Sequence, residues 1–197
     1  MGARRDALVA AAMKLFAERG YDGTSVADIQ VSAGLTGGSG ALYKHFASKA
    51  AVLEAGVDTY LETLNQNSRS TVDDLPADPR EALHVIASSV IDSMTADETM
   101  LRVLLRDLDQ HPELAERLWK GVMADVYTEL AHWIRRQVTE GTISVSDPDA
   151  VAAVLMSALT QWPILQALLK KTPGDLTRSA FVAAWTDTAS RVLDLPL

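Results

Sequence analysis

The stretch TSVADIQVSAGLTGGSGALYKHFASK at residues 24–49 decides the fold, because it has the order helix, sharp turn, helix. Ser25 and Asp28 stand three residues apart, which is the spacing of a capping box at a helix start. Val26 and Ile29 then share one apolar face of that first helix. Gly34 readily adopts the left-handed conformation that ends a helix. The stretch therefore predicts a helix-turn-helix.

A second helix is predicted from about Ser39 through Phe46. Leu42 and Phe46, four residues apart, face inward, whereas the residues at 43–45 face outward. A helix that follows a sharp turn and carries outward polar side chains is the element with which a helix-turn-helix reads DNA. The alternative is that these outward residues are only a solvated helix end.

The segment at residues 36–41, which leads into this second helix, consists of small and polar residues. Small residues let the backbone approach base edges, and threonine or alanine methyl groups can contact the methyl group of thymine. The segment has no arginine, asparagine or glutamine for a bidentate contact with a base. We therefore expect DNA shape and phosphate contacts to carry more of the specificity than direct base contacts.

The region from about Arg4 to Leu61 resembles the N-terminal domain of the TetR family of transcriptional regulators. The resemblance rests on LFAERGY at 15–21 with TSV at 24–26, AGLT at 33–36, LYKHF at 42–46 and SK at 48–49. The chain departs from the family pattern at two places. The segment GGSGA at 37–41 is about two residues longer than usual, which leaves the register of the reading helix open, and Ala50 stands where glutamate is frequent.

This resemblance implies an all-α protein with two domains. Residues 1–48 are expected to form a helix-turn-helix DNA-binding domain, and residues 49–197 an effector-binding and dimerisation domain, with the fourth helix as the connector. The resemblance also implies a double-stranded DNA operator as partner and a homodimer through the last two helices. The residues expected to contact DNA are Arg4, Arg5, Thr24, Ser25, Thr36, Gly38, Ser39, Gly40, Ala41, Tyr43, Lys44, His45 and Lys49.

Charge is unevenly distributed along the chain. The net charge is −8, but residues 1–56 carry six Lys or Arg against five Asp or Glu, so the acidic excess lies in the remainder. Arg4, Arg5, Lys44 and Lys49 flank the predicted reading segment, which indicates a local basic patch on an acidic protein. We expect such a protein to bind DNA with a strong dependence on salt.

The rest of the chain has apolar residues at helical spacing and no stretch with the alternation of a strand. Asp78-Pro79 and Asp147-Pro148 are typical helix starts. Helices are predicted over about 79–94, 97–108, 111–139, 147–171 and 176–194, and a polar loop with prolines over 66–79.

The C-terminal helices are apolar over most of their circumference, so they must bury two surfaces. One surface is the subunit core, and the other is a partner subunit, with Trp185 and Leu159 as candidate contacts, or a ligand cavity. The residues expected to line a pocket for an apolar, neutral or cationic effector are Trp119, Met123, Tyr127, Met156, Gln161 and Trp162. The alternative for each of them is that it belongs to the plain core.

Several other functional classes find no support in the sequence. The chain has no cysteine, and its histidines at 45, 84, 111 and 132 are scattered, so no metal site is predicted. No H-E-x-x-H, G-x-S-x-G or P-loop motif occurs, so we predict no catalytic residue and no cofactor. No stretch reaches the ~18 uninterrupted apolar residues of a membrane span, so a cytoplasmic protein without a membrane partner is expected.

These observations lead to the hypothesis of a ligand-responsive transcriptional regulator, in particular a repressor that a small apolar effector releases from its operator. One alternative is an activator, or a ligand-independent regulator, of the same fold. Another is an α-helical ligand-binding or enzymatic protein that keeps the N-terminal domain as structure only.

Overall fold

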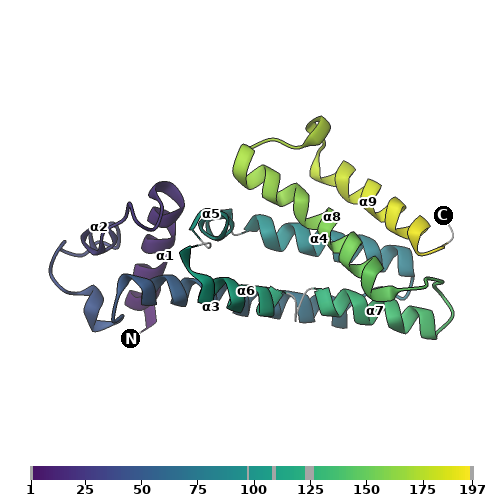
Figure 1. The fold of residues 1–197 in the computed structure, drawn as a ribbon, viewed down its shortest axis with the longest axis horizontal. Helices are drawn as coiled ribbons and strands as arrows, with labels where there is room; N and C mark the ends of the chain where they lie inside the picture. Colours follow the sequence, from purple (N-terminus) through teal and green to yellow (C-terminus); the bar gives the residue numbers. More distant parts are fainter. Residues whose placement is uncertain (1, 97, 108–109, 123–126, 196–197) are drawn as a thin grey trace. The chain divides into compact units, whose positions relative to one another are not determined.

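The computed structural model describes residues 2–96, 98–107, 110–122 and 127–195. Within these ranges the chain is helical and has no strand, so the all-α prediction is confirmed (Figure 1). The α-helices are α1 (Gly2–Arg19), α2 (Val26–Ser32), α3 (Lys49–Asp73), α4 (Pro79–Ala96), α5 (Glu98–Asp107), α6 (Pro112–Val122), α7 (Thr128–Thr139), α8 (Pro148–Leu169) and α9 (Arg178–Val192). Short 3₁₀ helices include η1 (Leu42–Lys44) and η4 (Pro173–Asp175).

The chain divides into two compact units. The N-terminal unit comprises Met1–Glu62 and Asp97–Trp119, and the C-terminal unit comprises Thr63–Ala96 and Lys120–Leu197. The long helix α3 therefore contributes to both units. The compact units differ from the expected functional division at residue 48, because the unit that holds the helix-turn-helix segment also includes α5, which packs on α1.

Close packing of helices around a small core holds the N-terminal unit together. Helix α1 packs against α2 and α5, and Leu8, Phe16 and Ile29 are fully buried. Gly56 of α3 faces Met13 of α1 so closely that a Cβ atom at Gly56 would lie 2.5 Å from the Met13 sulfur. A glycine at this position leaves room for the Met13 side chain, which would have to shift if a Cβ atom were added.

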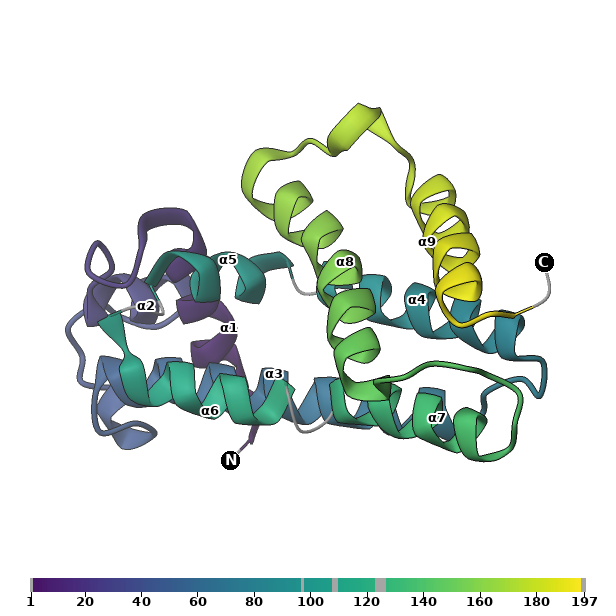
Figure 2. The ribbon, with the colours of Figure 1, turned by 45° about the vertical axis from the view of Figure 1, so that its right-hand side comes forward.

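The C-terminal unit is built around α8. Helix α4 packs against both α8 and α9, and α7 packs against α8 (Figure 2). The buried Trp185 of α9 donates a hydrogen bond from its indole N–H to the carbonyl oxygen of Leu155 in α8, at 3.0 Å. On the surface, Arg178 of α9 forms an ion pair with Asp92 of α4. An exposed pair of this kind contributes only about 0–1 kcal/mol, so the apolar core supplies most of the cohesion.

Trp185 and Leu159, which the sequence offered as candidates for a subunit interface, lie in this core. Leu159 is fully buried and Trp185 is 5% exposed within the single chain. The interpretation of these two residues as interface contacts was wrong, because both side chains are already covered by their own subunit. Apolar spacing on a helix marks a buried face without saying which partner buries it.

Helix starts were predicted more accurately than helix ends. Asp78 and Asp147 each accept a hydrogen bond from the backbone N–H three residues on, which confirms both as N-caps. The predicted loop over 66–79 was wrong in its first half, because α3 continues to Asp73. The polar residues there do not break a helix, whereas the prolines that follow do. Of the helix predicted over 111–139, α6 and α7 are described, and residues 123–126 lie outside the described residues.

Candidate DNA-binding surface and effector region

The segment between α2 and α3 lacks the second α-helix that the sequence predicted over residues 39–46. After α2 the backbone follows a series of turns, and the single helical turn is η1, at Leu42–Lys44 (Figure 1). The inward residues of the prediction are correct, because Leu42 is fully buried and Phe46 is 6% exposed. A helix cannot pass through Gly38 or Gly40, because the backbone there has positive φ angles of 73° and 68°, and only the single turn η1 follows them. These values are incompatible with a right-handed helix.

The turn that ends α2 has the geometry that the sequence predicted. Gly34 has a φ of 73°, and its N–H donates to the carbonyl oxygen of Val31. The next N–H, of Leu35, donates to the carbonyl oxygen of Gln30. These two bonds form a Schellman motif, which satisfies carbonyl groups that the end of the helix would otherwise leave unpaired.

Gln30 of α2 is a residue of this region that the sequence analysis missed. Its side chain is 1% exposed, and its Oε1 accepts a hydrogen bond from the N–H of Gly38 at 3.0 Å. A buried carboxamide therefore holds the middle of the glycine-rich segment. The signal available in the sequence was a glutamine directly after Ile29, an inward position of the short helix.

The start of α2 carries the predicted capping box. The backbone N–H of Asp28 donates to the Ser25 hydroxyl oxygen, and the Asp28 carboxylate accepts from the Ser25 backbone N–H and hydroxyl. These hydrogen bonds from Ser25 lower the pKa of the Asp28 carboxyl below its ordinary value. Its contribution to stability is therefore present above the unfolded-state pKa and is lost as the pH falls through the folded-state pKa.

A cluster around Lys49, the first residue of α3, fixes the exit of α1 against the start of α3. The Lys49 ammonium group donates hydrogen bonds to the carbonyl oxygens of Tyr21, at 2.7 Å, and Thr24, at 3.0 Å, and lies 4.0 Å from the centre of the Tyr21 ring. Thr24 is 1% exposed, and its hydroxyl donates to the carbonyl oxygen of Gly20. The side chain of Thr24 is therefore unavailable to DNA, which corrects its place among the expected contacts. Lys49 has two structural partners, so its contact with phosphate stays a prediction.

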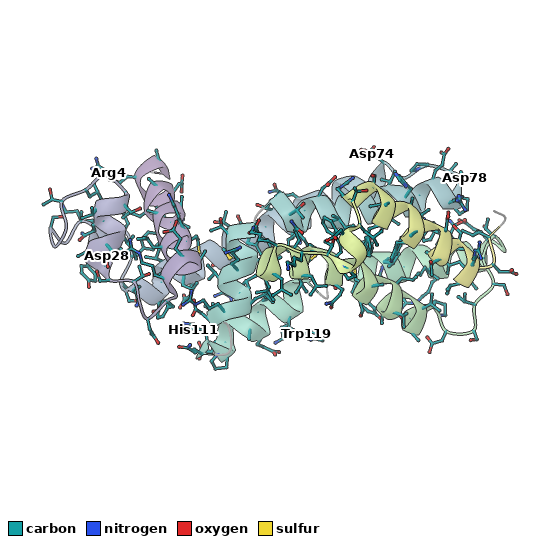
Figure 3. All side chains as sticks on the ribbon, turned by 90° about the horizontal axis from the view of Figure 1, so that it is seen from above. Arg4, Asp28, Asp74, Asp78, His111 and Trp119 are labelled. Carbon is teal, nitrogen blue, oxygen red and sulfur yellow. The ribbon has the colours of Figure 1, made fainter. Side chains whose placement is uncertain are left out.

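Tyr21 also connects this cluster to α5 and α6. Its backbone N–H donates to the buried carboxylate of Asp107 at 3.0 Å, and its ring packs edge-on against His111, with 4.6 Å between ring centres. His111 (labelled in Figure 3) and Asp107 line a small cavity of about 10 Å³, which has room for about one water molecule. Burial, and then the nearby Asp22 and Glu54, raise the pKa of the Tyr21 phenol. Sequence reasoning missed Asp107 and His111 because they come from distant elements.

The other expected DNA contacts are mostly exposed. Tyr43 is 60% exposed, and Lys44 and Arg4 (labelled in Figure 3) are exposed as well. The exposed guanidinium group of Arg5 lies 5.0 Å from the centre of the Phe46 ring, which places a cation at the end of the segment between α2 and α3. Ser25, Thr36, Gly38 and Ser39 are exposed, whereas Gly40, Ala41 and His45 are half-buried. The N-terminal unit thus presents basic and small polar residues next to one another.

The residues expected to line an effector pocket belong to different surroundings. Trp119 of α6 is 61% exposed and belongs to the N-terminal unit, whereas Met156 and Trp162 of α8 lie in the core of the C-terminal unit. Trp162 has a buried indole N–H with no acceptor among the described residues. Tyr127 is half-buried and donates its hydroxyl hydrogen bond to the carbonyl oxygen of Asp149, at 3.1 Å. Gln161 is exposed, and Met123 lies outside the described residues.

Sequence models of two families match the chain in succession. Residues 8–55 match the bacterial regulatory proteins of the tetR family, and residues 81–189 match the C-terminal domain of AefR-like transcriptional repressors. The second match alone covers more than half of the chain. The chain belongs to the TetR family of transcriptional regulators. Regulators of this family bind operator DNA and are not enzymes, so the enzymatic alternative is set aside.

Relatives of this TetR-family chain cover most of its length. It is 25% identical to the HTH-type transcriptional regulator EthR of Mycolicibacterium smegmatis over 171 residues, which are 87% of this chain and 77% of EthR. It is 28% identical over 200 residues to the HTH-type transcriptional regulator TtgR of Pseudomonas putida, with 97% and 91% of the two chains covered. The fold is similar to that of the fatty acid degradation regulator FadR from Bacillus halodurans, with a TM-score of 0.76, 18% identity and coverage of 96% and 95%.

We expect substitution of Lys44 to affect DNA binding by this TetR-family regulator, and substitution of Lys49 to affect its stability. Lys44→Ala should weaken binding to all DNA sequences and lower the slope of log affinity against log salt by about one, because one phosphate contact is lost. Its melting temperature should stay unchanged, since Lys44 is exposed.

Lys49→Ala should instead lower the melting temperature, because the part-buried carbonyl oxygens of Tyr21 and Thr24 lose their hydrogen-bond donor. Thermal unfolding and fluorescence anisotropy on labelled duplexes measure both quantities in both variants. Equal melting temperatures for Lys49→Ala and the wild type would show that the Lys49 cluster does not brace the unit.

Proposed function

We propose that this protein is a homodimeric transcriptional repressor that binds a roughly palindromic operator and is released from it by a small apolar effector. The observation that carries the proposal is the surface of the N-terminal unit, where the exposed residues 36–39 are followed along the chain by the exposed Tyr43 and Lys44, and where Arg5 lies over the ring of Phe46. Cations and a tyrosine hydroxyl in this arrangement suit phosphate contacts. Repression, rather than activation, is favoured by the C-terminal match to AefR-like transcriptional repressors.

Selection of DNA from a random or genomic library is the direct test of this proposal. The wild-type protein should enrich one pseudo-palindromic sequence whose half-sites lie about 34–36 Å apart, or a multiple of that distance, as a two-fold symmetric dimer requires. The bound fragment should survive competition by unrelated DNA in a mobility shift. Enrichment of no sequence would overturn the proposed function.

Effector binding is proposed for the C-terminal unit. The buried indole N–H of Trp162 lacks an acceptor among the described residues, and a buried donor without a partner is costly. A ligand or a water molecule that accepts from this N–H would remove the cost. The surrounding core is apolar, which favours an apolar molecule with one polar acceptor.

A panel of apolar compounds, matched in size and divided into neutral, cationic and anionic members, tests the proposed effector class. Neutral or cationic members should raise the melting temperature, because they bind only the folded protein, and should quench tryptophan fluorescence. They should also weaken operator binding, because the effector and the operator each lower the affinity of the protein for the other. Trp162→Phe should reduce these effects while the fold persists. Stabilisation by anionic members alone would contradict the proposed effector class, because an anion in this apolar core would lack a partner.

The dimer interface is proposed to lie on the outer faces of α8 and α9. Exposed small and apolar residues recur there at helical spacing, namely Ala153, Val154 and Ala158 of α8 and Ala180, Ala183 and Ala184 of α9. Small side chains on neighbouring helices let a second pair of helices approach closely. A four-helix contact across a two-fold axis therefore fits this face.

The same face accounts for the composition of α8. By length and composition alone, this helix of 22 residues, which includes an 18-residue stretch with a mean hydropathy of 1.5, could cross a membrane. A core helix of a soluble protein passes the same test, and α8 packs against α4, α7 and α9 on its inner side. We propose that its outer side meets the partner subunit, that no membrane is involved and that the protein acts in the cytoplasm.

Val154 and Leu159 offer a matched pair of substitutions for the dimer proposal. Val154 is 68% exposed in the single chain, whereas Leu159 is fully buried. Val154→Glu should give a folded monomer in sedimentation velocity, because a carboxylate at the dimer contact loses its hydration without gaining a partner. Leu159→Glu should abolish folding, since the charge enters the subunit core. A folded dimer of Val154→Glu with wild-type stability would place the interface elsewhere.

A further inference from the structure

The segment expected to read DNA has a defined conformation that is not an α-helix. Residues 36–41 cross the surface between the Schellman turn at Gly34 and the fully buried Leu42. Within the segment, the N–H of Ser39 donates to the carbonyl oxygen of Thr36. The N–H of Tyr43 then donates to the carbonyl oxygen of Gly40 and opens η1. The segment is thus a pair of turns fixed at both ends.

Gln30 fixes the middle of this segment from within the protein. Its Oε1 accepts from the Gly38 N–H, eight residues on, while its Nε2 is buried without an acceptor among the described residues. A buried amide with one unpaired group is less favourable than an apolar side chain of the same size. Burial of the unpaired Nε2 carries a desolvation cost, and the hydrogen bond from Gly38 offsets it.

Gly38 and Gly40 are required by conformation and not by lack of space. Both have positive φ angles, and a Cβ atom built on either would meet no atom within 4 Å. The methyl group of an alanine at either position would clash with no neighbouring atom, but the positive φ angle would strain the alanine backbone. Glycine also disfavours a helix, so both the hydrogen bond and the glycines select turns over a helix.

We infer that Gln30 is a positioning residue for DNA recognition, and that it holds residues 36–41 in a non-helical turn that contacts DNA in this form. The inference rests on the proposed function, because it names how the proposed DNA-binding surface recognises its operator. The groups presented are the exposed backbone and the hydroxyls of Thr36 and Ser39, flanked by the exposed Tyr43 and Lys44. Residues 36–41 include no arginine, asparagine or glutamine for a bidentate contact with a base, so recognition by this segment depends on the fit of the turn to the groove.

The experiment compares three variants with the wild type on the DNA that the wild type selects. Gln30→Met keeps the volume but removes the acceptor, and Gly40→Ala strains the turn while favouring a helix. Gly141→Ala is the control, because Gly141 has a φ of 75°, an equally open environment and a place in the C-terminal unit. Fluorescence anisotropy at one fixed salt concentration gives the affinity for selected and for unrelated duplexes.

Gln30→Met and Gly40→Ala should each weaken binding to the selected DNA by about tenfold or more, as the loss of one specific contact does, and leave binding to unrelated DNA nearly unchanged. Gly141→Ala should lose stability without this loss of affinity. In the wild type the Gly38 amide should be protected from hydrogen exchange, and in Gln30→Met it should not. If Gln30→Met fails to fold, Gly38→Ala replaces it.

Two results would overturn the inference alone. Tighter binding by Gly40→Ala would show that the segment binds DNA as a helix, and unchanged affinity in both Gln30→Met and Gly40→Ala would show that its conformation is irrelevant to recognition. A wild-type protein that selects no DNA would overturn the proposed function and the inference together. That outcome is recognised before any variant is made.

Discussion

The positive φ angles of Gly38 and Gly40 are the constraint on which the DNA-facing part of this protein depends. They exclude a right-handed helix through residues 38–40, so the chain must close the distance from Gly34 to the buried Leu42 by turns. The hydrogen bond from the Gly38 N–H to Gln30 selects one such path. In the proposed function, the N-terminal unit therefore presents to DNA a short backbone surface with hydroxyl groups, followed along the chain by the exposed Lys44.

The turn can be well defined only because the elements around it are firmly held. The Lys49 ammonium group pairs with the carbonyl oxygens of Tyr21 and Thr24, and Asp107 of α5 accepts from the Tyr21 N–H. These contacts replace hydrogen bonds to water with hydrogen bonds inside the protein at a point where three helices meet, and charged partners make such bonds stronger than neutral ones. A charge that looks like a phosphate ligand in the sequence thus has a structural role as well.

The sequence was sufficient for the features that depend on neighbouring residues. The capping box at Ser25, the N-caps at Asp78 and Asp147 and the turn at Gly34 follow from local chemistry, and the structure shows each of them. The family and the all-α fold were also predicted, because their motifs are local. Features that depend on distant partners were missed or wrong: the glycines outweighed the helical pattern of residues 39–46, and the burial of Thr24 and the role of Asp107 became visible only in the folded chain.

The Cα chemical shifts of residues 36–46, measured by NMR in the free protein and in its complex with the selected DNA, test the central claim most directly. A non-helical reading segment predicts helical shifts only around Leu42–Lys44, with residues 36–41 outside the helical range in both states. A continuous run of helical shifts from Thr36 to Phe46 in the complex would contradict the account, because the turn held by Gln30 would then be only the resting form of an ordinary reading helix.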